Sequence, residues 1–275
     1  MGKNNRVLTV TPIQNNSYSA TTIKQPYMNK PNYYIPAGGL LTTNNVKTIK
    51  GEKLGYTTYI LYLSPYNQNS QGKNVCPMAT VGCSSACLFG SGKGSMDNVI
   101  KGRTNKTEIF LSNRELFLKM IYSEIAQIEI KHKIEGGKFV IRLNGTSDIS
   151  WEKFKIPGTN KNIFELFPKV KFYDYTKNYL RFKNALPKNY YLLFSRSENN
   201  HNISLEMLKK GINVAMVFDV IPESYNGYKV INGDENDLRH LDKKGVIVGL
   251  RYKKVTTKGF DNSKAFRDGF AIKTQ

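Results

Sequence analysis

The hydrophobic pattern of the chain alternates between two periods. Short runs rich in β-branched and aromatic residues predict buried strands. Six such runs are present: Tyr59–Leu63, Lys138–Asn144, Val170–Tyr175, Tyr190–Ser195, Asn213–Val217 and Val246–Leu250. Between them lie segments whose apolar residues recur three and four positions apart, the spacing of one helix face. Strands that alternate with helices predict an α/β fold with parallel strands and right-handed crossovers.

The longest helix is predicted at Asn113–Lys131, where Ser112 and Glu115 have the spacing of a capping box. Shorter helices are predicted at Ile163–Phe167 and Ser204–Lys210. Together with six strands, these helices favour a partial or irregular (β/α) barrel. An open doubly wound sheet is the alternative.

The first part of the chain has a different character. Residues 1–55 are polar, are interrupted by Pro26, Pro31 and Pro36, and predict a loop-rich N-terminal arm, which leaves 56–275 as a single α/β domain. No run of about 18 apolar residues exists, and the N-terminus lacks the apolar block of a secretory signal. We therefore expect no membrane span and a cytoplasmic location, where thiols stay reduced.

The charge balance points to a polyanionic partner. The chain carries 41 Lys and Arg against 21 Asp and Glu, a net charge of +20. Such an excess attracts nucleic acid. The alternative explanation of this charge is a coding bias that places lysine on solvent-exposed faces. No long basic run marks a particular binding segment. The oligomeric state is not predicted.

The most informative stretch is Cys76–Gly94, because it holds all three cysteines of the chain. Cys76, Cys83 and Cys87 are spaced C-x6-C-x3-C and are followed by three alternating glycines. An odd number of cysteines in one loop fits metal ligation better than disulfides. Three thiolates can hold zinc or an iron–sulfur cluster with one coordination position left open. The residues 76–94 thus form a predicted metal loop that directly follows the first strand.

Polar residues follow three of the predicted strands, at the edge where α/β folds bind their ligands. Among them, the expected catalytic groups are Asp148, Asp174, Lys177 and Glu198, and the expected cofactor-binding groups are Asn144, Thr146, Ser147, Ser195 and Arg196. The alternative is that they are ordinary turn residues. Within the second strand, Arg142 needs a carboxylate partner, and the candidates are Asp148, Asp174 and Glu198.

Two resemblances extend this picture. The ordered blocks CPMATVGCSSACL, KTEIFLSNRELFL, RLNGTSDISWE, FYDYTK, FSRSENN and VINGDENDLRHLD resemble the gene-product-88 family of phage and plasmid proteins over Leu61–Tyr252. This resemblance implies an origin in a mobile element and a life inside a bacterial host.

The cysteine loop is also similar to that of radical S-adenosylmethionine enzymes, which place three cysteines after the first strand of a partial barrel. Their usual spacing is C-x3-C-x2-C, and they carry an aromatic residue where Ala86 stands here. The resemblance implies a four-iron–four-sulfur cluster on Cys76, Cys83 and Cys87. It also implies S-adenosylmethionine bound by Asn144–Asp148, with Glu198 on its ribose.

Three functions follow from these observations. The first is an iron–sulfur, radical-type enzyme that acts on or near nucleic acid or nucleotides. The second is a zinc-stabilised nucleic-acid-binding protein of phage or plasmid replication or host takeover, with His201 or His240 as a possible fourth ligand. The third is a metal-free virion or scaffolding protein.

Overall fold

A computed structural model describes residues 33–43, 46–87, 92–256 and 261–274, all within one compact unit of the chain. Residues 1–32 of the predicted N-terminal arm lie outside the described residues. The rest of that arm contains the two-residue strand β1 and the helix α1. Within the described residues, no helix has the length and apolar character needed to cross a membrane.

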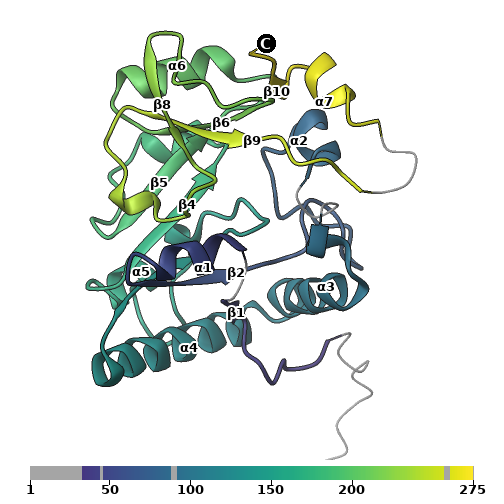
Figure 1. Ribbon diagram of the computed structural model, residues 1–275. Helices are drawn as coiled ribbons and strands as arrows, with labels where there is room; N and C mark the ends of the chain where they lie inside the picture. Colours follow the sequence, from purple (N-terminus) through teal and green to yellow (C-terminus); the bar gives the residue numbers. More distant parts are fainter. Residues whose placement is uncertain (1–32, 44–45, 88–91, 257–260, 275) are drawn as a thin grey trace, which may run out of the picture. The chain divides into compact units, whose positions relative to one another are not determined.

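A mostly parallel sheet forms the centre of this unit (Figure 1). Its order is β1-β2-β3-β4-β5-β6-β9-β8-β7, and the tenth strand, β10, pairs with β6. The pairs from β2 to β6 and from β6 through β9 to β8 are parallel, while β1 and β7 are antiparallel to their neighbours. The strands are β1 (Leu41–Thr42), β2 (Tyr56–Leu61), β3 (Lys138–Arg142), β4 (Lys171–Thr176), β5 (Tyr190–Ser195), β6 (Val214–Phe218), β7 (Ser224–Tyr225), β8 (Tyr228–Asn232), β9 (Ile247–Arg251) and β10 (Ala271–Ile272).

The helices lie before, between and after these strands. The α-helices are α1 (Val46–Glu52), α2 (Val81–Ser85), α3 (Asp97–Ser112), α4 (Arg114–Glu135), α5 (Ile163–Leu166), α6 (His201–Lys209) and α7 (Lys264–Arg267). Single 3-10 turns are η2 (Gly92–Ser95), η3 (Trp151–Lys153), η4 (Tyr179–Phe182) and η5 (Arg239–Leu241).

The two faces of the sheet are covered unequally, because neighbouring residues of a strand point to opposite faces. On β3, Ile141 belongs to the large core cluster with α3, α4 and α5. Val140 packs instead in a small cluster with Leu238, beside η5. The long helices α3 and α4 therefore cover one face, and short segments cover the other.

The sheet is open in the part of the chain that the structure describes. Its end strands β1 and β7 do not pair with each other, so the α/β class with parallel strands is confirmed and barrel closure is not observed. The cap predicted for the long helix is wrong. Ser112 is the last residue of α3, and Asn113 caps α4 by accepting a hydrogen bond from Leu116 N. Serine and asparagine are both favourable N-cap residues, so the sequence pattern alone did not distinguish Ser112 from Asn113 as the cap.

The last strand has an unusual position that shapes the site. β5 pairs with β6 only at Val214 and Ala215, and β10 pairs with the following residues Val217 and Phe218. The C-terminal segment thereby reaches the carboxyl end of the sheet. Arg196, just after β5, donates hydrogen bonds from Nη1 to Gly269 O and Phe270 O and so holds this segment in place.

Candidate functional site

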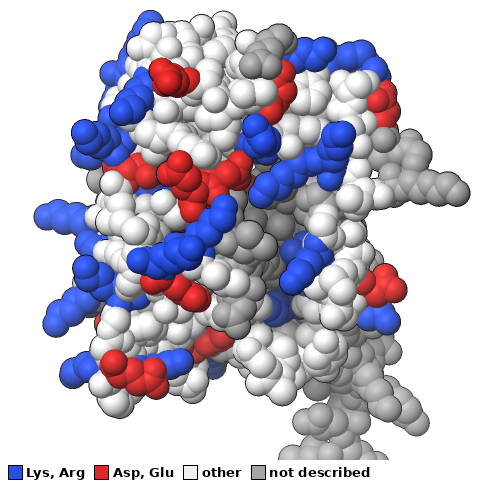
Figure 2. All heavy atoms as spheres, viewed as in Figure 1, with Lys and Arg blue, Asp and Glu red and all other residues white. Residues whose placement is uncertain are grey.

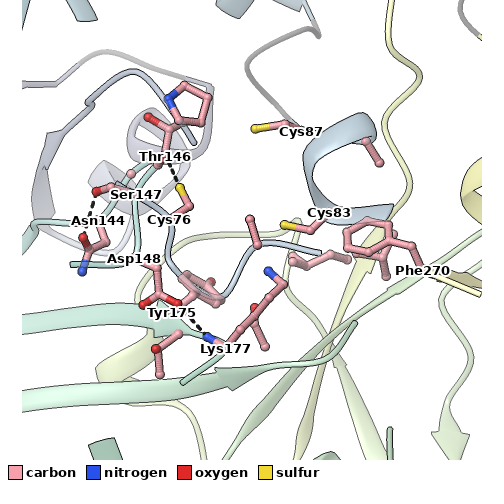
Figure 3. A pocket seen from close by; sticks show the side chains of 18 of the residues that line it. Cys76, Cys83, Cys87, Asn144, Thr146, Ser147, Asp148, Tyr175, Lys177 and Phe270 are labelled. Atoms are coloured by element: carbon pink, nitrogen blue, oxygen red, sulfur yellow. Dashed lines mark hydrogen bonds between the residues drawn. The ribbon is translucent and has the colours of Figure 1, made fainter. Parts of the chain in front are cut away.

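A pocket of about 240 Å³ lies at the carboxyl end of the parallel strands (Figure 3). One wall is the cysteine loop. The others come from the carboxyl-terminal ends of β3, β4, β5, β6 and β9 and the residues just after them, together with Asp234 after β8 and Phe270 just before β10. Its lining includes Cys76, Met78, Cys83, Cys87, Asn144, Thr146, Ser147, Asp148, Lys177, Ser195, Val217, Leu250, Arg251, Lys253 and Phe270. This is where open α/β sheets place their ligands.

All three cysteines line this pocket and form no disulfide. The Cys76 Sγ lies in the loop after β2, accepts a hydrogen bond from Tyr66 N and donates one to Thr146 O, both at 3.4 Å. Cys83 belongs to α2, and Cys87 follows the C-cap residue of that helix. A spacing of four residues on a helical turn places two side chains on the same side. In Figure 3 the Cys83 and Cys87 sulfurs point in the same direction, toward the side of Cys76.

A chain of hydrogen bonds fixes the helix that carries Cys83. Thr80 caps α2, and its Oγ1 accepts a hydrogen bond from Cys83 N. Glu198, from the loop after β5, accepts from the Thr80 hydroxyl at 2.9 Å and from Gly82 N at 2.7 Å. A Cβ at Gly82 would lie 2.8 Å from Glu198 Oε2, so only glycine lets this carboxylate approach. Glu198 therefore positions the cysteine loop.

Electrostatics around the thiols favour a cation. Burial, together with the nearby Cys87 and Cys83, raises the pKa of the Cys76 thiol to about 12. Burial alone would lower the pKa of Lys177, but the Cys83 thiol and Asp148 outweigh it and raise that pKa. Three thiolates in a low-dielectric site repel one another, and this repulsion favours the protonated thiols. A bound metal ion adds positive charge and favours the thiolates instead.

The donor set suits a thiophilic metal, although its atoms are not gathered into a coordination sphere. Among the described residues, no three His, Cys, Asp or Glu side chains are close enough together to hold an ion as they stand. Cys87 borders residues 88–91, which include part of the predicted glycine-rich turn and lie outside the described residues. Metal binding would thus require the sulfur atoms to move closer together within this loop.

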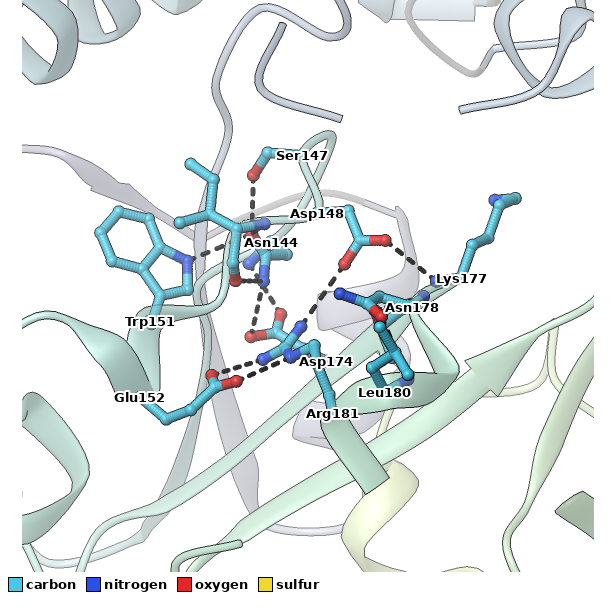
Figure 4. A network of polar contacts seen from close by, with 12 residues as sticks. Asn144, Ser147, Asp148, Trp151, Glu152, Asp174, Lys177, Asn178, Leu180 and Arg181 are labelled. Atoms are coloured by element: carbon cyan, nitrogen blue, oxygen red, sulfur yellow. Dashed lines mark hydrogen bonds and ion pairs between the residues drawn. The ribbon is translucent and has the colours of Figure 1, made fainter. Parts of the chain in front are cut away.

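Behind the pocket, a buried polar network fixes the residues that follow β3 (Figure 4). Asn144 Oδ1 accepts hydrogen bonds from the Ser147 hydroxyl, Ile149 N and Trp151 Nε1. Asp174 on β4 accepts from Asn144 N at 2.7 Å and from the Tyr190 hydroxyl at 3.0 Å. Burial raises the pKa of Asp174 to about 7, against the opposing effect of these donors. The side chains of Asn144 and Asp174 are therefore hydrogen-bonded to other groups of the protein.

A second part of the network holds Asp148 beside the pocket. Its Oδ2 accepts from Lys177 N at 2.9 Å, and its Oδ1 lies 3.4 Å from Arg181 Nη1. Arg181 also binds both carboxylate oxygens of Glu152, a geometry that fixes its direction. Asp148 N donates to Val75 O, next to Cys76. The residues after β3 are thereby linked to the cysteine loop.

Arg142 faces the pocket side of the sheet, but its partner differs from the three carboxylates predicted for it. Its Nη1 contacts Asp237 Oδ2 at 3.1 Å, and Asp237 also accepts from the hydroxyls of Tyr173 and Tyr175. The guanidinium lies 4.6 Å from the centre of the Tyr175 ring. Asp237 is 95 positions from Arg142, so spacing gave no signal for this pair.

Comparison with known proteins identifies the family. A model described as gene product 88 matches residues 39–269, which is well over half of the chain. The chain belongs to the gene product 88 family. The match extends beyond Leu61–Tyr252 at both ends and includes every residue that lines the pocket except Phe270. No curated protein and no solved structure matches the chain.

Most of the predicted site residues meet at the pocket of this gene product 88 protein. The lining contains the three cysteines and also Asn144, Thr146, Ser147, Asp148, Lys177 and Ser195. Three predicted residues are placed elsewhere: Asp174 lies behind the lining, Arg196 binds the residues just before β10, and Glu198 binds the cysteine loop. Thr146 is also engaged, because its hydroxyl donates to Leu63 O.

The opposite wall was not predicted from the sequence. It consists of Leu250, Arg251, Tyr252, Lys253 and Phe270. Arg251 and Lys253 come after an apolar run in a chain that has many other lysines, so their charge alone did not identify them as site residues. The two histidines predicted as alternative fourth ligands, His201 and His240, are not part of the lining. His240 packs against Tyr56 and Tyr191.

Proposed function

We propose that this protein is an iron–sulfur enzyme whose cluster is held by Cys76, Cys83 and Cys87, with the pocket beside them as the substrate site. The observation that supports it is the convergence of all three cysteines on one pocket at the carboxyl end of a parallel sheet. Three protein thiolates leave one iron of a four-iron cluster open. When bound, such a cluster would chelate the amino-acid part of S-adenosylmethionine at that iron and supply one electron.

The residues around the cysteines have roles that follow from their contacts. Glu198 holds the α2 turn through Thr80 and Gly82, and so fixes where Cys83 lies relative to the sheet. Phe270 packs with Cys83 and Ala86, and this apolar contact limits water access from the C-terminal side. Lys177 lies beside Cys83 and carries a positive charge that balances bound thiolates.

The test is purification without oxygen, followed by the visible spectrum and assays of iron, sulfide and zinc. We expect a brown protein with about four irons per chain. Cys83→Ala should abolish metal retention, whereas Ser84→Ala, at an exposed neighbouring position of α2, should leave it unchanged. A colourless, metal-free wild-type protein would refute the proposal.

A zinc site is the second candidate, and the position of Asp148 favours it. Asp148 lies close enough to Cys76 to contribute to the raised pKa of that thiol. Three cysteines and one carboxylate complete the four ligands of a closed zinc site. In that case the metal stabilises a nucleic-acid-binding protein, and a single zinc would survive Lys177→Met but not Asp148→Asn.

The net charge of +20 supports action on or near nucleic acid or nucleotides. Together with membership of the gene product 88 family, it fits a role for a mobile element inside a bacterial host. Binding of nucleic acid that stayed constant as salt rose would contradict phosphate contacts.

A further inference from the structure

The wall opposite the cysteines carries cationic and aromatic side chains, which the proposed metal site does not require. Arg251 is the last residue of β9, and it lines the pocket together with Tyr252 and Lys253, which follow the strand, and with Phe270. Figure 2 shows Lys and Arg side chains beside a hollow on the face that contains the segment after β9. The pocket thus has a thiol side and a cationic side.

The cationic side retains free binding capacity. Arg251 forms no ion pair within the described part of the chain, and only its backbone N–H is used, in a 2.8 Å hydrogen bond to Asp234 Oδ2. Lys253 is ion-paired with Asp234, whose carboxylate also lines the pocket, but the Nζ–Oδ1 distance of 3.8 Å is longer than a hydrogen bond, so the N–H donors of Lys253 stay available to a ligand. Both side chains are exposed at the mouth of the pocket. A planar guanidinium beside an ammonium matches the geometry of a phosphate group.

Between the thiols and the cations, part of the lining is apolar. Val217 lies near the end of β6, where that strand pairs with β10, and Leu250 and Phe270 add to the same wall. The neighbouring polar groups of Asn144, Thr146 and Ser147 are already engaged within the protein, whereas the Ser195 hydroxyl has no hydrogen-bond partner among the described residues. A ligand that fits this arrangement has an apolar ring, a hydroxyl-bearing middle and an anionic end.

We propose that the pocket binds a mononucleotide, with its phosphate on Arg251 and Lys253 and its base against Phe270, Val217 and Leu250. The cavity of about 240 Å³ is on the scale of a small-molecule site, which favours a free nucleotide over a polymer as the ligand. The inference rests on the proposal that this pocket is the substrate site, and it narrows the substrate class from nucleic acid to a free nucleotide. It is independent of which metal the cysteines bind.

The experiment is calorimetric titration of the purified full chain with the four ribonucleoside monophosphates, ribose 5-phosphate, inorganic phosphate and a single-stranded oligonucleotide. We expect at least one monophosphate to bind about 10-fold or more tightly than ribose 5-phosphate, because only the nucleotide contacts the apolar wall. Its affinity should fall as salt rises, since the cations are exposed. Equal affinity for the monophosphates and inorganic phosphate, or no binding of any monophosphate, would overturn the proposal.

Variants locate the site and separate it from a nucleic-acid surface. Arg251→Gln and Lys253→Gln should each weaken monophosphate binding about 10-fold, the effect of losing one charge-assisted contact. Lys254→Gln is the matched control, because Lys254 is exposed, adjacent and outside the pocket lining, and it should have no effect. If the oligonucleotide binds more tightly than every monophosphate and Lys254→Gln weakens it as much as Arg251→Gln, the cations serve a polymer and the proposal is wrong.

Metal content distinguishes the failure of this inference from the failure of the proposed function. Arg251→Gln should keep the metal of the wild type, and a loss of metal would show that its effect on nucleotide binding is indirect and would overturn the assignment. If the wild type contains no metal but still binds a monophosphate through Arg251, the iron–sulfur proposal fails and the nucleotide site stands.

Discussion

The hydrogen bonds that Glu198 accepts from the cysteine loop give the sharpest test of how this site is assembled. Glu198→Ala removes the acceptor of two bonds, one from the buried Gly82 N–H and one from the Thr80 hydroxyl. Thr80 in turn accepts from Cys83 N, so the loss of Glu198 reaches Cys83 through one residue. The change should loosen α2 while leaving the distant core intact.

The magnitude follows from the number and type of bonds. A hydrogen bond to a charged group contributes about 1.5–3 kcal/mol when its partner is lost in a buried setting. Glu198 is half-buried, so water partly replaces it, and we take about 1.5–3 kcal/mol for the two bonds together. Since 1.4 kcal/mol corresponds to about a factor of ten, local opening of α2 should become about 10–100-fold more frequent.

Amide hydrogen exchange measured by mass spectrometry reads this opening directly and needs no bound metal. Peptides covering Thr80–Ala86 should exchange about 10–100-fold faster in Glu198→Ala, while peptides from β4 and β5 keep their rates. Glu206→Ala is the control, because Glu206 is exposed on the helix α6 that follows. Unchanged exchange in Thr80–Ala86 would refute the role given to Glu198.

Three further predictions concern neighbouring groups. Asp174→Asn should remove a pH dependence of the free energy of unfolding. The pKa of Asp174 is about 7 in the folded state and near 3.8 in the unfolded state, so its stabilising effect is present below about pH 4 and is lost by pH 7. Denaturant titrations of the wild type should show this loss, at most about 4 kcal/mol. Asp237→Ala should lower the free energy of unfolding by about 3–5 kcal/mol, because it leaves the Arg142 charge without its partner, and a loss below about 1 kcal/mol would contradict that pairing. Gly82→Ala should speed exchange of the same α2 peptide as Glu198→Ala, since its Cβ would lie 2.8 Å from both Glu198 Oε2 and Phe270 Cβ, and wild-type exchange would refute this packing.

The sheet was largely predictable because its strands are continuous apolar runs. The runs at Lys138–Asn144 and Tyr190–Ser195 correspond closely to β3 and β5. β8 was missed, since Lys229 and Asn232 interrupt its apolar pattern. α3 was missed as well. Its sequence is polar and contains Gly102, and its buried residues, which include Asn105, Lys106 and Glu108, are held by tertiary contacts.

The site was predictable only in part, for a topological reason. Residues that follow neighbouring parallel strands meet at one edge of the sheet, so the grouping of Asn144–Asp148, Lys177 and Ser195 followed from the order of elements alone. Which side chain faces the ligand depends on contacts between distant segments. Local residue spacing did not predict the contact of Glu198 with Gly82 or the pairing of β10 with β6.

The central claim is that three cysteines on one wall of the pocket hold an iron–sulfur cluster. X-ray absorption at the iron edge of anaerobically purified protein tests it directly, because it reports the ligand atoms and their distances. We expect about four irons per chain in a sulfur environment, and we expect Cys83→Ser to lose them. A wild-type protein without iron, or iron bound only through oxygen and nitrogen, would contradict it.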